Sequence, residues 1–147
     1  MTKKIVAEAL QQGLVDLIEL SLQAKEAHWN IRGKGFQSLH EHLDLIVDQT
    51  RTAYDEFAER LAALGEVASG RSQDIVKTTT LDEFPAGHVA VADGYKLIEA
   101  ALMKSAETLK GYISKVDDDD PLSADLLIST ARELEKSAWM LRMQFAE

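Results

Sequence analysis

Hydrophobic residues recur every three or four positions over four long stretches of the chain, the period of helices that are buried on one side. These stretches cover about residues 3–30, 36–64 and 88–116, and the fourth begins after the acidic run 117–120. No segment alternates with period two over a convincing length. The pattern therefore predicts an all-α protein built from four amphipathic helices.

Each predicted helix carries an apolar stripe that we expect to form the core. In chain order the stripes are Ile5, Ala9, Leu14, Leu17, Ser21, Ala24 and His28; Leu39, Leu43, Ile46, Thr50, Tyr54, Phe57, Leu61 and Leu64; Val91, Tyr95, Ile98, Leu102, Leu109 and Val116; and Leu127, Ala131, Leu134, Ala138, Leu141 and Phe145. Gly65 is a stop signal after the second helix. Asp120 suits the N-cap of the fourth helix and Pro121 its first position, and the acidic residues before them favour a helix N-terminus.

The connection over residues 66–87 is too long for a simple turn between neighbouring antiparallel helices. It has room for one short helical turn near residues 72–76. We therefore expect a four-helix bundle in which this connection crosses along the bundle and carries a short extra helix.

Composition narrows the function classes. At 147 residues the chain is expected to form a single domain, 1–147, and without cysteine it has no disulfide, thiolate zinc site or thiol nucleophile. The formal net charge of −9 argues against a phosphate-seeking surface. Polar residues interrupt the N-terminal apolar pattern, so we expect no signal peptide, no membrane span and a cytoplasmic protein.

The second predicted helix carries the residues best suited to bind a metal, namely His40, Asp44, Asp55 and Glu59. At about 100° per residue they fall within an arc of roughly 100°, centred roughly 130° from the core stripe. They therefore face away from the core of their own bundle. A plain solvated helix face has the same appearance, and that alternative stays open. The Glu-x-x-His pairs that build a di-iron site inside a bundle core are absent.

The His40/Asp44 pair lies fifteen residues from the Asp55/Glu59 pair, or about 22 Å along a helix. One chain cannot bring both pairs to the same ion. A second copy, packed antiparallel about a two-fold axis near residues 49–50, would place each pair opposite its complement and give two identical sites per dimer. His28 would join His40 and Asp44 if the turn after the first helix folds it back, although a histidine on an apolar stripe is also typical of a core residue.

The order and spacing of these histidines and carboxylates resemble those of a known family, the Dps miniferritins. The pattern is a His followed by Trp-Asn, a second His twelve residues later, an Asp after four more and an Asp-x-x-x-Glu pair after eleven more. Its positions here are His28, Trp29, Asn30, His40, Asp44, Asp55 and Glu59, within KEAHWNIRGKGFQSLHEHLD (25–44) and DEFAERLAALG (55–65). Similarity continues in TTTLDEFPAG (78–87) and ADLLISTARELEKSAWML (124–141).

The resemblance implies a ferritin-like four-helix bundle that assembles into a shell of twelve subunits. It implies ferroxidase centres at two-fold interfaces, with His28, His40 and Asp44 from one subunit and Asp55 and Glu59 from its mate. The implied reaction is oxidation of Fe(II), preferably by hydrogen peroxide, and storage of Fe(III) mineral, which protects against oxidative damage. Zinc and manganese are competitors for the same ligand types. Trp29 would lie near the centre, either in a redox role or as a packed aromatic residue.

By the same resemblance, Asp120 and Asp125 lie near a three-fold pore through which iron enters. Favourable charge at a helix N-terminus explains the acidic run equally well. DNA-binding members carry a basic extension, whereas only Lys3 and Lys4 precede the first predicted helix, so we expect little or no DNA binding at physiological salt. The alternatives are a non-catalytic partner-binding bundle, a DNA-compacting protein with secondary iron chemistry and a zinc hydrolase.

Overall fold

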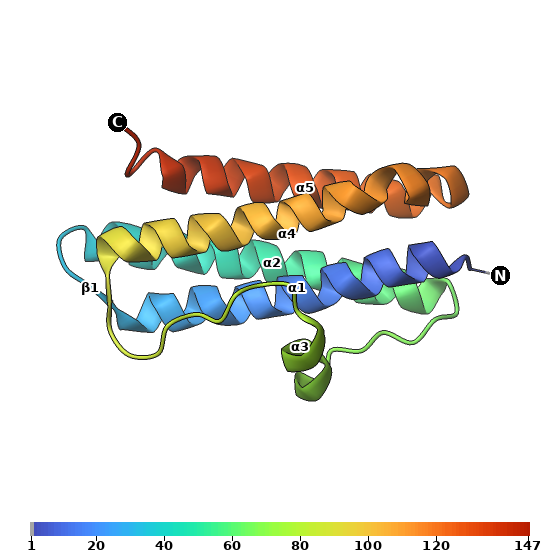
Figure 1. Ribbon diagram of the computed structural model, residues 1–147, viewed down its shortest axis with the longest axis horizontal. Coiled ribbons are helices and arrows are strands. Elements are labelled where there is room, and N and C mark those ends of the chain that lie inside the picture. Colours follow the sequence, from blue (N-terminus) through green and yellow to red (C-terminus); the bar gives the residue numbers. More distant parts are fainter. Residues whose placement is uncertain (1) are drawn as a thin grey trace.

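In the computed structural model, which describes residues 2–147, four long helices run side by side (Figure 1). The helices are α1 (Lys4–Asn30), α2 (Phe36–Ala63), the short α3 (Ser72–Thr78), α4 (Val91–Asp119) and α5 (Pro121–Arg142). α1 packs antiparallel to α2, and α4 packs antiparallel to α5. The connection from α2 to α4 returns along the whole bundle, so these two helices run in the same direction (Figure 1). The predicted all-α bundle with a long crossover and a short extra helix is confirmed.

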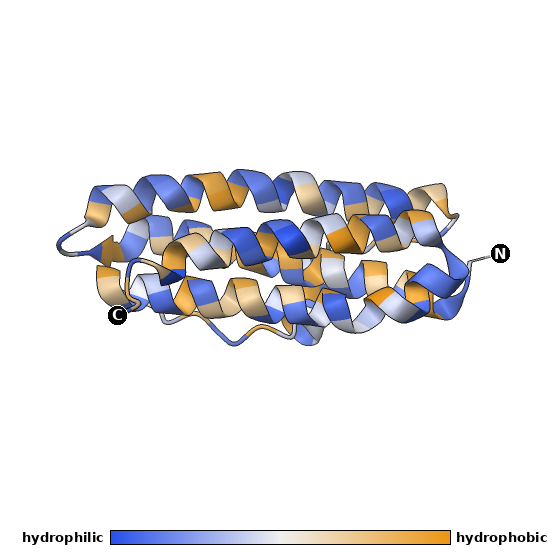
Figure 2. Ribbon diagram, turned by 90° about the horizontal axis from the view of Figure 1, so that it is seen from above, coloured by the Kyte–Doolittle hydropathy of each residue, from blue (hydrophilic) through white to orange (hydrophobic). Residues whose placement is uncertain are grey.

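The predicted apolar stripes form the core. Every stripe residue is buried or partly buried. Phe57 and leucines from three of the long helices are among the largest fully buried side chains. In Figure 2, hydrophobic and hydrophilic residues alternate along each long helix, as expected when only one face of a helix is covered.

The C-terminus of α2 ends in the glycine-dependent turn that the sequence predicts. Gly65 has φ of 82°, a left-handed conformation that costs other residues energy. Its N–H donates to the carbonyl of Ala62 at 3.0 Å, and the N–H of Glu66 donates to the carbonyl of Leu61 at 2.9 Å. These two bonds are the Schellman pattern, which satisfies carbonyls that the end of a helix leaves without partners.

The acidic run is placed differently from the prediction. α4 begins at Val91 rather than His88 and continues through Asp117–Asp119, so these aspartates lie in its last turn and not ahead of α5. The physical reason is Pro121, which disfavours helical geometry only at the residue before it. Asp120 accordingly adopts φ −151° and ψ 88°, ends α4 and caps α5. The predicted N-cap and first-position proline are confirmed, whereas the favourable dipole interaction of residues 117–119 was wrong.

The sequence also missed two short strands, β1 (Ile31–Arg32) and β2 (Val89–Ala90), which pair in parallel. Two residues are too few to show alternation. The pair joins the turn between α1 and α2 to the start of α4. The two segments lie so close that a Cβ on Gly94 would be 2.9 Å from the Ile31 side chain, which is shorter than a normal contact. Across the described residues 2–147, no helix is long and apolar enough to cross a membrane.

Candidate metal centre

His28 and His40 form a stacked pair at the end of the bundle where α1 leads into α2. Their ring centroids lie 3.6 Å apart with an interplanar angle of 12°. Nδ1 of His28 is 2.7 Å from the carbonyl oxygen of His40, and Nδ1 of His40 is 2.7 Å from the carbonyl oxygen of His28. A carbonyl only accepts, so both Nδ1 atoms must carry the proton. In the neutral rings, both Nε2 atoms then present a lone pair, the form in which histidine binds a metal.

The turn after α1 produces this pairing. Gly35, with φ of 84°, starts α2 in the left-handed region, and β1 holds the turn against β2. Phe36 stacks on the His40 ring, with the two ring centroids 4.8 Å apart. His28 is 8% exposed, as expected for a residue on the apolar stripe, yet its ring lies beside His40 rather than in the middle of the core.

Asp44 lies one turn after His40 and joins the same half of the site. Its Oδ1 is 3.5 Å from Nδ1 of His28 and accepts a hydrogen bond from Lys25 Nζ at 2.6 Å. The hydrogen bond from the Lys25 ammonium lowers the pKa of the Asp44 carboxyl below its usual value. The carboxylate is therefore ionised well below neutral pH. We call His28, His40 and Asp44 the histidine half-site.

Asp55 and Glu59 lie further along α2 and are exposed. The fifteen residues that separate them from His40 and Asp44 correspond to about 22 Å of straight helix. We call Asp55 and Glu59 the carboxylate half-site. Over residues 2–147, no group of three or more His, Asp or Glu side chains is arranged to hold a metal ion within one chain.

Trp29 does not pack into the core. It is 65% exposed, and two other large apolar side chains of the α1 and α2 pair, Leu22 and Leu45, are 55% and 61% exposed. All three residues lie on the same two helices as the candidate half-sites. Of the two roles that the sequence left open for Trp29, the packed aromatic residue at an interface matches this exposure.

Asp120 is tied into a local network. Arg60 Nη2 lies 2.9 Å from Oδ2 of Asp120, and the hydroxyl of Ser123 donates to the same oxygen at 2.5 Å. Burial raises the pKa of the Asp120 carboxyl, but hydrogen bonds from Ser123 and Arg60 outweigh it, and the pKa lies below its usual value. Asp125 is exposed in the second turn of α5. A pore role for Asp120 would require it to serve an ion while bound to Arg60, so the pore remains a prediction.

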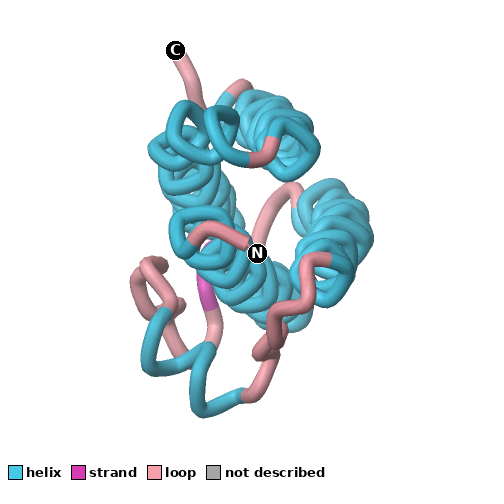
Figure 3. The backbone as a smooth tube through the Cα atoms, turned by 90° about the vertical axis from the view of Figure 1, so that its right-hand side faces the viewer, coloured by secondary structure: helices cyan, strands magenta, loops and turns pink. Residues whose placement is uncertain are grey.

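Sequence reasoning missed the polar residues of α1 that hold the crossover. Asp16, only 2% exposed, accepts hydrogen bonds from the hydroxyls of Thr79 and Thr80 at 2.8 and 2.7 Å and from the N–H of Thr80 at 2.8 Å. Gln23 Nε2 donates to the carbonyl of Asp82 at 2.8 Å. As a result, the crossover and α3 lie outside the four long helices, against α1 (Figure 3). In the sequence these residues look like interruptions of an apolar pattern. Their spacing along one helix face was the available signal that they bind another segment.

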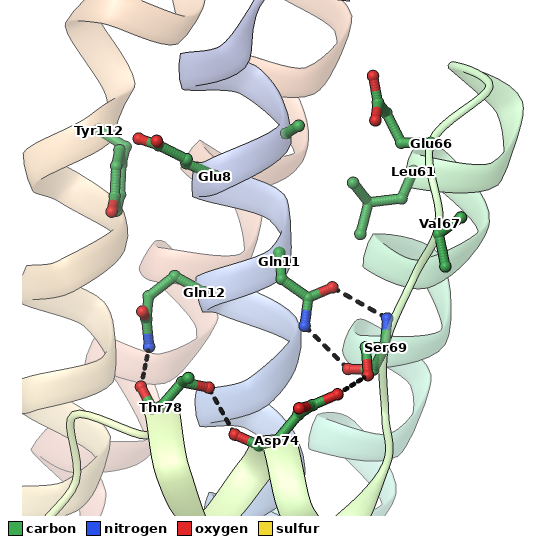
Figure 4. Close-up of a pocket in the computed structure, with 11 residues that line it drawn as sticks. Glu8, Gln11, Gln12, Leu61, Glu66, Val67, Ser69, Asp74, Thr78 and Tyr112 are labelled. Carbon is green, nitrogen blue, oxygen red and sulfur yellow. Dashed lines mark hydrogen bonds between the residues drawn. The ribbon is translucent and has the colours of Figure 1, made fainter.

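A groove of about 620 Å³ lies beside this crossover, lined among others by Gln11, Gln12, Ser69 and Asp74 (Figure 4). The side-chain amide of Gln11 exchanges two hydrogen bonds with the backbone of Ser69, and Gln12 donates to the carbonyl of Thr78. Asp74 accepts from the Ser69 hydroxyl. The polar groups of the groove therefore fasten the crossover, and none of the predicted metal ligands lines it.

The family model of the ferritin-like domain matches residues 7–147. The fine tangled pili major subunit of Haemophilus ducreyi is 40% identical over 96% of this chain and 75% of its own length. The DNA protection during starvation protein of Agrobacterium fabrum is 33% identical over 99% of this chain and 90% of its own length. The structure of Dps from Microbacterium arborescens in the high iron form superimposes with a TM-score of 0.91 at 30% identity, covering 100% of this chain and 99% of that one.

Proposed function

Because the chain belongs to the Dps proteins of the ferritin-like family, whose members store iron and protect against oxidative damage, we propose that it is a ferroxidase. Its substrates are Fe(II) and, preferably, hydrogen peroxide, and its product is an Fe(III) mineral. The mineral is stored inside a shell of twelve subunits in the cytoplasm. The high iron form of the Microbacterium arborescens relative supports iron as the metal.

The observation that carries the proposal is the reciprocal hydrogen bonding of His28 and His40. Each Nδ1–H is held by the other residue's carbonyl oxygen at 2.7 Å, so the rings are fixed before a metal arrives. Pre-organised neutral imidazoles bind Fe(II) without the cost of ordering two side chains. A histidine that only fills space in a core has no need of a hydrogen bond at Nδ1 that keeps the Nε2 lone pair available.

The second half of the centre comes from another copy of the chain. One subunit contributes the histidine half-site and its mate contributes Asp55 and Glu59. The exposed Leu22, Trp29 and Leu45 lie on these helices and are available to such an interface. A two-fold axis then generates two equivalent centres per dimer.

The parts of the centre have separate roles in the reaction. The imidazoles bind Fe(II) and leave positions open for the oxidant, whereas the hard carboxylate oxygens stabilise the more highly charged Fe(III). Two Fe(II) ions each give one electron to one hydrogen peroxide, its O–O bond breaks, and two protons complete two water molecules. This two-electron reduction releases no hydroxyl radical.

The test is oxidation of Fe(II) by the assembled protein. Fe(II) is loaded anaerobically, hydrogen peroxide is added, and the Fe(III) absorbance is followed. We expect His28→Ala and Glu59→Ala each to slow oxidation at least about 100-fold, because each removes a ligand. Glu56→Ala removes an exposed acid of the same helix outside both half-sites and should keep the full rate.

Oxidation no faster than in buffer, by a correctly assembled oligomer, would overturn the proposal. So would full activity in both ligand variants. The first result would favour the non-catalytic bundle, in which the chain serves only as a subunit of a larger assembly, and the second would assign the oxidation to another site.

A further inference from the structure

A lysine ammonium contacts the carboxylate of the histidine half-site. Lys25 lies one turn before His28 on α1, and its Nζ is 2.6 Å from Oδ1 of Asp44. The same oxygen is 3.5 Å from Nδ1 of His28. The Lys25 side chain is 28% exposed and that of Asp44 is 48% exposed, so the pair lies at the mouth of the half-site rather than in the core.

This contact conflicts with metal binding. An ammonium that remains hydrogen-bonded to a ligand carboxylate keeps a positive charge within a few ångströms of the incoming divalent cation. The two cations repel, and one carboxylate oxygen cannot serve both fully. Lys25 therefore has to withdraw from Asp44 as the metal arrives. Its flexible four-carbon stem permits such movement without a backbone change.

We propose that Lys25 is a positioning residue that neutralises and holds Asp44 through this contact and is exchanged for the divalent cation when the metal binds. The proposal rests on the function proposed above and adds a step to it: metal binding replaces one cation by another at Asp44. Before the exchange, the ammonium also offsets the repulsion expected when Asp44 meets two carboxylates of the mate.

The exchange predicts that removing the Lys25 charge increases the affinity for the metal, whereas loss of a supporting residue usually decreases it. Removing a lysine that merely supports its neighbour would disorder Asp44 and weaken metal binding. Removing a lysine that competes with the metal makes binding tighter. From the strength of a partly exposed ion pair we expect about fivefold tighter binding in Lys25→Met, which keeps the length and most of the packing of the side chain.

The experiment measures binding of Co(II) alone, by its visible absorption, to the assembled protein without oxidant. Lys25→Met is compared with the unaltered protein and with Lys25→Arg. Arginine keeps the competing charge and binds carboxylates through two N–H groups, so its affinity should be no higher than that of the unaltered protein. Lys110→Met is the matched control, because it removes a lysine paired with Glu107 and Glu135 at a distance from the half-sites and should change nothing.

Tighter binding in Lys25→Met, with unchanged affinity in Lys110→Met, supports the exchange. Binding by the unaltered protein that stays equal or weakens in Lys25→Met overturns the exchange and leaves the ferroxidase proposal standing. If neither protein binds Co(II), both proposals fail. Unfolding of either variant is recognised by circular dichroism, and in that case Lys25→Gln, also without charge, decides between the same outcomes.

Discussion

Asp120 lies between α4 and α5, and its side chain also binds α2. It caps α5 by accepting from the N–H of Ser123 at 3.4 Å, and its other contacts are with the Ser123 hydroxyl and with Arg60 on α2. A side chain with several partners loses all of them together when it is removed.

We expect Asp120→Ala to lower the free energy of unfolding by about 1–2 kcal/mol. Loss of the N-cap alone usually costs about 1 kcal/mol, and loss of the ion pair with Arg60 brings the expected value toward the upper end of the range. Urea denaturation at fixed protein concentration measures it. Asp118→Ala is the control, since Asp118 is exposed in the last turn of α4, where a negative charge meets the negative end of the helix dipole. Its removal should leave stability unchanged or raise it by a few tenths of a kcal/mol.

The Asp120 contribution should depend on pH in a defined direction. The pKa of Asp120 lies below its usual value in the folded protein, so ionised Asp120 favours the folded state. The contribution is complete above about pH 4, the ordinary carboxyl range, and disappears as the pH falls through the lower folded-state pKa. The stability difference between the unaltered protein and Asp120→Asn should therefore be constant near neutral pH and shrink in acid. A difference that grows in acid would contradict the assignment.

Two helical glycines give opposite expectations for the same substitution. A Cβ on Gly13 would lie 2.3 Å from Cε2 of Phe57, which is fully buried, whereas a Cβ on Gly111 meets nothing within 4 Å. Gly13→Ala should destabilise the protein by about 1–3 kcal/mol through overpacking. Gly111→Ala should stabilise it by about 0.5–1 kcal/mol, because alanine is the better helix former. Thermal unfolding of the two variants side by side tests this, and equal shifts would show that the approach of α1 to α2 at Gly13 is not tight.

At the scale of the elements, the crossover depends on α1. Asp16 satisfies the Thr79 and Thr80 hydroxyls and one backbone N–H at almost complete burial. Asp16→Ala leaves these donors without an acceptor, and we expect a loss of roughly 3 kcal/mol from unsatisfied buried groups. Hydrogen exchange over residues 66–88 should accelerate before the long helices respond. Asp82→Ala, in the same segment but with a side chain that is 99% exposed, should leave the exchange unchanged.

The long helices could be predicted because their apolar spacing is a property of consecutive residues. Two helix ends could be predicted as well, because they follow from local chemistry: the start of α5 with Asp120 as its N-cap, and the end of α2 with the turn at Gly65. The two-residue strands could not be predicted, since they pair residues more than fifty positions apart. The partners of Asp16 are equally distant, and only the spacing of the polar residues along one face of α1 pointed to its role. The acidic run was misplaced because Pro121, the first residue of α5, constrains only the residue before it, so α4 continues through Asp119.

At the scale of the whole molecule, the candidate centre was only partly accessible from the sequence. The helix wheel placed four candidate ligands away from the core, and the spacing of about 22 Å means that one shared centre needs a second copy. Neither the helix wheel nor the spacing indicates that His28 and His40 bind each other's backbone carbonyls, because that contact depends on how the turn at residues 31–35 folds. Lys25 gave no signal at all, since a lysine one turn before a histidine is ordinary on a helix surface.

The central claim is that each centre is shared between two copies of the chain, and complementation tests it directly. His28→Ala lacks the histidine half-site and Glu59→Ala lacks the carboxylate half-site, so neither oligomer should oxidise Fe(II) alone. In randomly mixed assemblies half of the dimers contain one of each, and such a dimer keeps one intact centre of two. Coexpression of the two variants should therefore restore about a quarter of the unaltered Fe(II) oxidation rate. Mixed oligomers that remain as inactive as the single variants would contradict the shared centre.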